Sequence, residues 1–216
     1  MKKYKAIIFD FDGTLANTYE GIFNSYVFAA QCMDLPCPTK ELVDGAIGAS
    51  LRDVFIDRFG LDQEKANTAV EYYRTRYARE GIHEVELYPG MKEFLEKAYE
   101  DGMKLGVATL KLEAFAVEML EYMGVGHLFE CIKGIDPLSK HNKKTILLEC
   151  LKEMGIDKEE AVLIGDSSFD EIGAREAGVD FIAVTYGFGF HSEADICELN
   201  TVMIAQSTTE LDVLLS

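Results

Sequence analysis

Two pairs of carboxylates, far apart in the sequence, each follow a short apolar segment. The four residues are Asp10, Asp12, Asp166 and Asp170, and the apolar segments before them are 6–9 and 161–164. A carboxylate at the carboxyl end of a buried strand points into the crevice where open α/β sheets bind ligands. Several carboxylates in one crevice repel each other, so such a site calls for a cation or a shared proton. An oxygen-rich pocket of this kind suits Mg²⁺.

The elements that must position these residues read as alternating strands and helices. Short apolar segments are followed by segments with helical periodicity, which predicts a parallel sheet with helices on both faces. The expected strands are 6–9, 105–108, 161–164 and 181–184, with a short one near 131–133. The expected helices are 112–123, 143–154, 169–177 and 209–215. Gly155 and Gly178 fit the C-terminal ends of two of them. The fold class is therefore α/β, a doubly wound parallel sheet with a Rossmann-like core.

One region breaks the alternation. Between about residues 16 and 87 no convincing strand is found, and the pattern predicts the successive helices 19–33, 39–46, 51–59 and 62–80. An all-helical block that begins just after the first carboxylate pair reads as an insertion that serves as a lid. We therefore expect a discontinuous core formed by 1–15 and 88–216, and a helical cap formed by 16–87.

The composition excludes several classes of function. The 216 residues carry a formal net charge of −17, which disfavours binding to nucleic acid or to an anionic membrane through a basic surface. No signal peptide and no apolar run of membrane-spanning length is seen, so a cytoplasmic protein is expected. The five cysteines lack metal-ligand spacing, and free thiols are favoured over a disulfide between Cys32 and Cys37.

The ordered motifs resemble those of the haloacid-dehalogenase-like hydrolase superfamily. They are Asp10-Phe11-Asp12-Gly13-Thr14, Val107-Ala108-Thr109, a lysine near Lys143, and Gly165-Asp166 with Asp170. More narrowly, the chain resembles the phosphoglycolate-phosphatase-like subgroup with a helical cap. The resemblance spans nearly the whole chain and implies Mg²⁺-dependent hydrolysis of a phosphate ester through an aspartyl-phosphate.

The resemblance also implies roles for individual residues. Asp10 is the expected nucleophile and metal ligand. Asp12 is the expected general acid and base, and its backbone carbonyl is a further metal contact. Asp166 is the expected side-chain ligand beside Asp10, while Asp170, one helical turn later, orients the lysine or a metal-bound water. Thr109 is expected to bind phosphoryl oxygens, although a lone threonine in such a place is more often a helix N-cap.

The phosphate-binding lysine has three candidates. Lys143 opens a predicted helix and is the first choice, followed by Lys140 and then Lys144. At least two lysines of this basic cluster must be solvated surface residues. Lys111, two residues after Thr109, matches a Thr-x-Lys pattern but is equally readable as a solvated side chain.

These expectations predict a phosphatase of a small phosphorylated metabolite that acts as a monomer or homodimer. Phosphoglycolate leads as substrate by analogy, while a nucleotidase, a pyrophosphatase or a sugar phosphomutase with the same nucleophile are alternatives. A different class is a non-catalytic module, because receiver domains also combine a strand-end aspartate, a threonine and a lysine with Mg²⁺. A silent relative that only binds a partner is a third possibility.

Overall fold

The structure is a computed structural model that describes residues 4–44, 46–136 and 141–215, with side chains described up to residue 212. It divides into two compact units. The helical unit is Thr18–Val85, and the core unit is formed by the chain before and after it. The boundaries drawn from the sequence lie two residues outside the helical unit at both ends.

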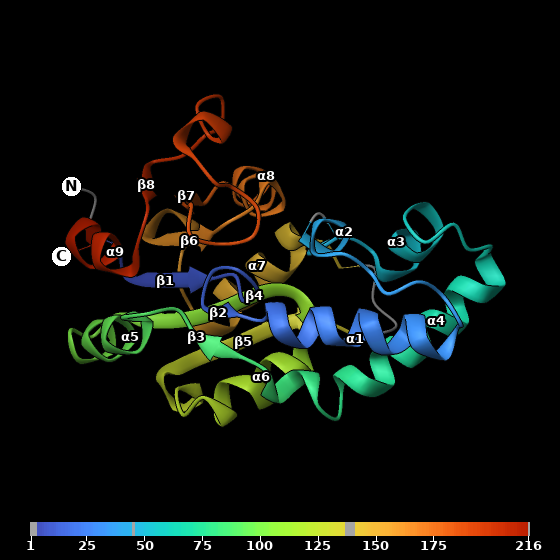
Figure 1. Cartoon of the computed structure of the whole chain (residues 1–216). Coiled ribbons are helices and arrows are strands. Elements are labelled where there is room, and N and C mark those ends of the chain that lie inside the picture. Colours follow the sequence, from blue (N-terminus) through green and yellow to red (C-terminus); the bar gives the residue numbers. More distant parts are fainter. Residues whose placement is uncertain (1–3, 45, 137–140, 216) are drawn as a thin grey trace. The chain divides into compact units, whose positions relative to one another are not determined.

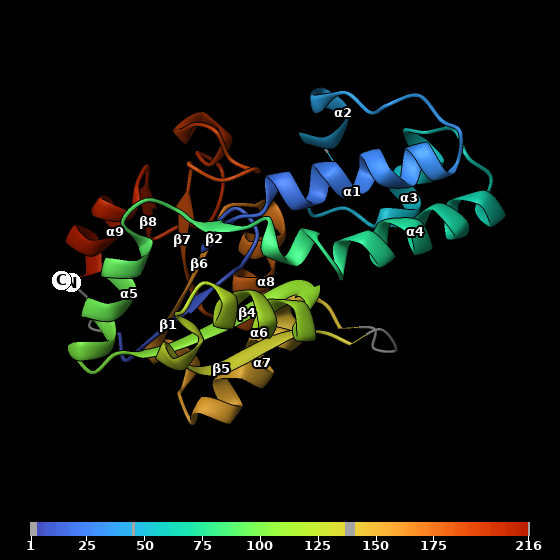
Figure 2. The same cartoon turned by 60° about the horizontal axis from the view of Figure 1, so that its bottom comes forward.

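The core unit contains a six-stranded sheet, shown with its helices in Figures 1 and 2. In spatial order the strands are β5 (Phe129–Ile135), β4 (Lys104–Leu112), β1 (Ala6–Phe9), β6 (Ala161–Gly165), β7 (Asp180–Val184) and β8 (Met203–Ala205). Every neighbouring pair is parallel. The chain adds β4 and β5 on one side of β1 and then returns to add β6, β7 and β8 on the other. This confirms the predicted doubly wound α/β class.

Helices cover both faces of the sheet. They are α5 (Met91–Glu100), α6 (Glu113–Tyr122), α7 (Lys143–Met154), α8 (Ser168–Ala177) and α9 (Thr208–Leu215). The β1 strand explains why two covered faces are needed, because all four of its residues are buried although successive side chains point to opposite faces. Ile8 faces the core cluster that includes Ile146 of α7, whereas the Phe9 ring lies edge-on to Phe94 of α5, with ring centroids 6.2 Å apart.

Helix ends in the core follow local sequence signals. Asn142 caps α7, because its Oδ1 accepts a hydrogen bond from the backbone N–H of Thr145 at 3.0 Å. Gly155 and Gly178 end α7 and α8 in the left-handed conformation, with φ of 63° and 74°, as their positions predict. The cap at Asn142 fixes Lys143 as the first residue of α7.

The helical unit contains α1 (Tyr19–Cys32), α2 (Lys40–Asp44), α3 (Leu51–Asp57) and α4 (Gln63–Tyr77). A buried ion pair joins α4 to the end of the unit. Arg76 donates from both terminal nitrogens to Glu84, at 2.6 and 2.7 Å, and Asn24 of α1 donates to the same carboxylate at 3.1 Å. Because Arg76 is buried, this pairing holds the end of the unit to two of its helices.

The two chain segments that connect the units pair with each other. β2 (Ala16–Asn17) and β3 (Glu86–Leu87) form a two-stranded antiparallel ladder, with Ala16 opposite Leu87 and Asn17 opposite Glu86. Strands of two residues leave no periodic signal, and the sequence did not predict them. The sequence reading also missed α5 and β8, and it ended β4 four residues too early.

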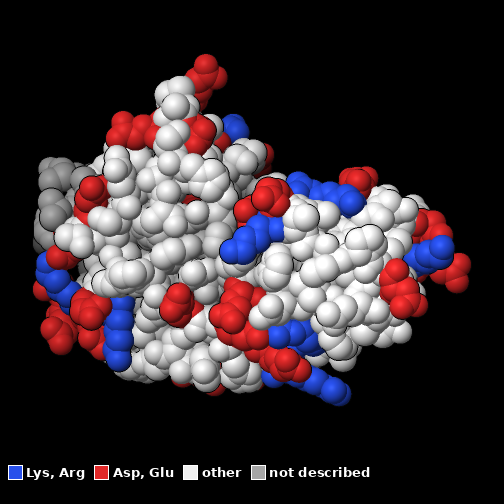
Figure 3. Space-filling model, in the orientation of Figure 1, with Lys and Arg blue, Asp and Glu red and all other residues white. Residues whose placement is uncertain are grey.

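Charged side chains on the face drawn in Figure 3 are interspersed, with lysines and arginines lying among acidic groups. All five cysteines are free thiols, so the Cys32–Cys37 disulfide is absent, as favoured from the sequence. Among the described residues, no helix is both long and apolar enough to cross a membrane.

Candidate active site

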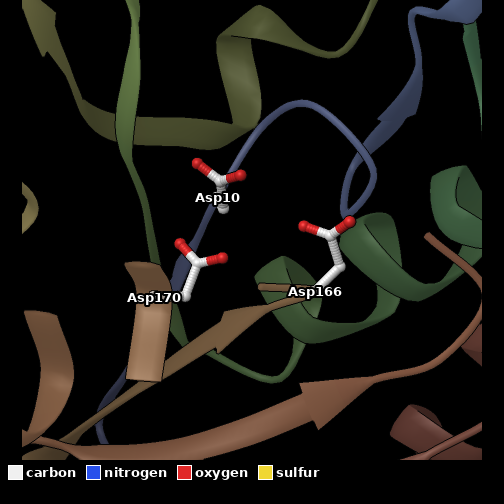
Figure 4. A group of neighbouring side chains, drawn as sticks. All are labelled: Asp10, Asp166 and Asp170. Carbon is white, nitrogen blue, oxygen red and sulfur yellow. The ribbon is translucent and has the colours of Figure 1, made fainter. Parts of the chain in front are cut away.

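Three buried aspartates converge at the carboxyl edge of the sheet. Asp10 directly follows β1, Asp166 directly follows β6, and Asp170 lies in the first turn of α8. One carboxylate oxygen from each lies within 4.8 Å of one from each of the others. Figure 4 shows the three carboxylates around a common space. Because β1 and β6 are neighbours in the sheet, residues 156 positions apart in sequence meet here.

Lys143 is the cation of this cluster. Its buried Nζ lies 2.5 Å from Oδ1 of Asp10 and 2.5 Å from Oδ1 of Asp170. Gly173 of α8 gives the lysine its path, since a Cβ at that position would lie 2.5 Å from Cγ of Lys143. The lysine predicted first therefore contacts the predicted nucleophile directly.

The other two candidate lysines do not share this position. Lys144 is half-buried on α7, and Lys140 lies outside the described residues.

Asp170 and Asp166 are each held by further hydrogen bonds. The backbone N–H and the hydroxyl of Ser167 donate to Oδ2 of Asp170, at 3.1 and 2.5 Å. The backbone N–H groups of Phe188 and Gly189 donate to Oδ2 of Asp166, at 2.7 and 3.0 Å. Asp170 thus uses both oxygens on the lysine and the helix cap, while Asp166 has one oxygen fixed by the backbone.

Burial dominates the electrostatics of the cluster. It raises the pKa of Asp10 to about 6, against the lowering effect of Lys143 and with repulsion from Asp170. Burial, followed by repulsion from Asp170 and Asp10, raises the pKa of Asp166 to about 7. Burial opposes the charged form of Lys143, but the two carboxylates outweigh it and raise the pKa of the lysine to about 12. When the three carboxylates are ionised, the single positive charge of Lys143 therefore does not balance their negative charge.

The cluster has the donor chemistry of a divalent cation site. Three carboxylates meet one ammonium group, so one added dication would offset the remaining negative charge. Hard cations of this size prefer carboxylate oxygens, and protein interiors hold such groups only when they are paired or bound to metal. Asp10 and Asp166 are the two carboxylates here that the lysine and the helix cap do not fully occupy.

Asp12 lies beside the cluster and has its own cation. Lys111 Nζ lies 2.8 and 3.1 Å from the two carboxylate oxygens of Asp12, and 5.5 Å from the centre of the Phe11 ring. The Lys111 side chain is only 7% exposed, so the solvated reading of this lysine is wrong. The sequence signal available for this contact was the position of Lys111, two residues after Thr109 of a buried strand.

Thr109 is buried within β4, where its Oγ1 accepts a hydrogen bond from the Lys111 backbone N–H at 3.2 Å. It does not cap a helix, because β4 continues to Leu112 and α6 begins at Glu113. The helix-cap reading fails because the strand persists three residues beyond the threonine. Thr109 thus belongs to the strand next to β1.

A comparison with protein families identifies the class of this site. The model of the haloacid dehalogenase-like hydrolases matches residues 7–184, which include every aspartate and lysine described above. The chain belongs to the haloacid dehalogenase-like hydrolase family.

Relatives within this family carry several phosphatase names. A 5'-nucleotidase from Pseudomonas aeruginosa is 34% identical over 193 residues, covering 88% of this chain and 87% of the relative. A phosphoglycolate phosphatase from Vibrio parahaemolyticus is 29% identical over 216 residues, covering 96% and 94%. A solved haloacid dehalogenase-like hydrolase from Streptococcus pneumoniae superimposes with a TM-score of 0.91, at 30% identity and over the full length of both chains.

Proposed function

We propose that this protein is a Mg²⁺-dependent phosphatase that hydrolyses the phosphate ester of a small metabolite through an aspartyl-phosphate on Asp10. The observation that carries the proposal is the contact of the buried Asp10 with Lys143, beside Asp166, at the carboxyl edge of a doubly wound sheet. Phosphatase names among the relatives support the same reaction class.

Covalent catalysis assigns the first step to Asp10. A carboxylate oxygen of Asp10 attacks phosphorus, and the bond from phosphorus to the ester oxygen breaks. Asp12 gives its proton to the departing alkoxide. In the second step Asp12 takes a proton from water, whose oxygen attacks the aspartyl-phosphate, so that phosphate leaves and Asp10 is regenerated. One carboxylate thus serves as nucleophile and the other as acid and then base.

The remaining residues bind and neutralise charge. Lys143 and the Thr109 hydroxyl and N–H would bind phosphoryl oxygens, and Asp170 keeps Lys143 in place. The side chains of Asp10 and Asp166 and the backbone carbonyl of Asp12 would hold Mg²⁺. When bound, the ion supplies positive charge that offsets the negative charge of the phosphoryl oxygens.

The helical unit is assigned the role of a substrate-enclosing cap. It begins six residues after Asp12, and its two connecting segments are paired in the short β2–β3 ladder. A unit that enters and leaves the core through adjacent segments can move as one body by small changes at few residues. Water exclusion by such a cap would protect the aspartyl-phosphate from uncontrolled hydrolysis.

Phosphate release from a panel of substrates tests the proposal. The panel contains phosphoglycolate, nucleoside 5'-monophosphates, pyrophosphate and sugar phosphates, each with Mg²⁺ or chelator. Wild type is compared with Asp10→Asn and with Asp101→Asn, which changes an exposed aspartate in the same way. Turnover that is lost in Asp10→Asn and in chelator, but kept in Asp101→Asn, supports the proposal. The best substrate separates the phosphoglycolate and nucleotide alternatives.

Two other results would redirect the assignment. Isomerised sugar phosphate without net release of phosphate identifies a mutase. A stable phosphoprotein on Asp10, detected after acid quenching with no turnover, identifies a phospho-accepting module. A folded protein that neither releases nor accepts phosphate with Mg²⁺ overturns the proposal.

A further inference from the structure

The loop after β7 folds back onto the end of its neighbour β6. We call residues 185–190 the glycine loop. In addition to the two N–H groups that reach Oδ2 of Asp166, the N–H of Phe190 donates to the backbone oxygen of Asp166 at 2.7 Å. Three consecutive backbone donors therefore turn toward one residue, which the assigned chemistry uses only as a metal ligand.

The loop approaches Asp166 so closely that no side chain fits between them. A Cβ at Gly187 would lie 2.5 Å from Oδ2 of Asp166 and would overlap the backbone oxygen of Gly13. A Cβ at Gly189 would overlap the backbone oxygen of Asp166. Because β1, β6 and β7 are adjacent strands, the loops that follow them meet backbone to backbone around the Asp166 carboxylate.

The start of the loop is tied to the loop that follows β1. The Tyr186 hydroxyl donates to the backbone oxygen of Thr14 at 3.1 Å, and its ring packs on Tyr88 with centroids 4.8 Å apart. Both anchors belong to the core unit. The glycine loop is therefore fixed at Tyr186 before it reaches Asp166.

The two oxygens of Asp166 consequently differ. Oδ2 accepts two backbone N–H bonds, whereas no hydrogen bond to Oδ1 is found from the residues that the structure describes. Two donors on one oxygen fix the plane and the rotation of the carboxylate group. Hydrogen-bonded partners of this kind orient metal-ligating carboxylates and commonly alter metal affinity 10- to 100-fold when they are removed.

We propose that the glycine loop is a positioning element that orients Asp166 to bind the divalent cation through Oδ1 alone. The inference rests on the proposed function for the identity of that cation. Gly187 is its key residue, because any side chain there pushes the loop off the carboxylate. The alternative is that the hydrogen bonds between the glycine loop and Asp166 only hold the loop in place and do not affect metal binding.

Calorimetric titration with Mg²⁺ in the absence of substrate separates these two readings. The variants are Gly187→Ala, Tyr186→Phe and, as a matched control, Gly126→Ala, where a Cβ would come no closer than 3.3 Å to another atom. The melting temperature in chelator checks that each variant is folded. We expect Gly187→Ala to weaken Mg²⁺ binding about 10- to 100-fold. Tyr186→Phe keeps the three donors and should weaken it by less than about tenfold, while Gly126→Ala leaves it unchanged.

Steady-state kinetics adds a second readout. In Gly187→Ala the Mg²⁺ concentration for half-maximal activity should rise in step with the calorimetric constant. At saturating Mg²⁺, kcat should fall much less than the metal affinity. A folded Gly187→Ala protein that binds Mg²⁺ as tightly as wild type overturns the proposal.

Amide resonances of the wild-type protein provide a test that needs no variant. Mg²⁺ bound to Oδ1 withdraws charge from the carboxylate, so the Phe188 and Gly189 amide signals should shift in the titration and the Gly126 signal should not. Unshifted signals for Phe188 and Gly189 at saturating Mg²⁺ refute the proposal even if Gly187→Ala does not fold. Metal binding is measured without substrate, so a protein that binds Mg²⁺ as described but releases no phosphate refutes only the proposed function.

Discussion

Replacing Asp166 by asparagine tests how much burial of the carboxylate cluster costs the fold. In wild type the pKa of Asp166 rises from the ordinary 3.8 to about 7, because burial and two neighbouring carboxylates disfavour the charged form. The folded state therefore binds the proton more tightly than the unfolded state. The cost is absent below about pH 4, grows between about pH 4 and 7, and is complete above about pH 7. A shift of about three pH units corresponds to about 4 kcal/mol.

The assay is urea unfolding of wild type and Asp166→Asn from pH 4.5 to 8 in chelator. Asparagine keeps an oxygen for the two backbone donors and cannot ionise. As the pH rises, we expect the free energy of unfolding of the variant to increase relative to that of wild type, by up to about 4 kcal/mol at pH 8. In Mg²⁺ at 100 times its dissociation constant, wild type should recover about 2.7 kcal/mol that the variant does not. A stability difference that stays constant across this pH range in chelator would refute the reasoning.

Three further predictions concern the buried ion pairs. Lys143→Met leaves the carboxylate cluster without its cation, so we expect about 3–5 kcal/mol lower stability in urea at pH 7.5 and a smaller loss at pH 5; equal losses at both pH values would contradict this. Lys111→Met removes the lysine contact of Asp12, the proposed acid and base, so kcat should fall at least about tenfold more for an alkyl phosphate than for p-nitrophenyl phosphate, whose leaving group needs no proton; equal losses would show that Lys111 does not position that group. Glu84→Ala removes the carboxylate that accepts two short hydrogen bonds from the buried Arg76, and it should cost about 3–5 kcal/mol in thermal unfolding although Arg76 keeps its 3.4 Å contact with Glu80. The exposed Glu80→Ala should cost less than about 1 kcal/mol.

The sheet was predictable where strands are short, apolar and buried on both faces. β1, β6 and β7 satisfy this condition, and each begins within one residue of the range expected from the sequence. β4 was cut short because Thr109 read as a helix N-cap and Lys111 as a solvated side chain, although both continue the strand. Tertiary pairing with β5 and the ion pair to Asp12 outweigh that local preference.

The paired partners within the site were harder to predict than its aspartates. Asp10 and Asp166 could be predicted because they follow apolar strands, and Lys143 because it is the first residue of a predicted helix. The backbone donors of Phe188 and Gly189 carry no side-chain signal, because any residue has an N–H group. Likewise β2 and β3 are strands because they pair with each other, and neither segment by itself shows a strand pattern in the sequence.

That ladder makes the catalytic chemistry topologically independent of the insertion. Ala16 pairs with Leu87, so the two points where the chain leaves and re-enters the core lie side by side, with the 68 residues of the helical unit between them in sequence. Asp10, Lys143, Asp166 and Asp170 all belong to the core unit. Grafting the corresponding segment of a relative between Asn17 and Glu86 would therefore exchange one module while preserving the other. If the helical unit encloses the substrate as proposed, mutations within it and mutations among the aspartates and Lys143 of the core act on separate parts of the chain.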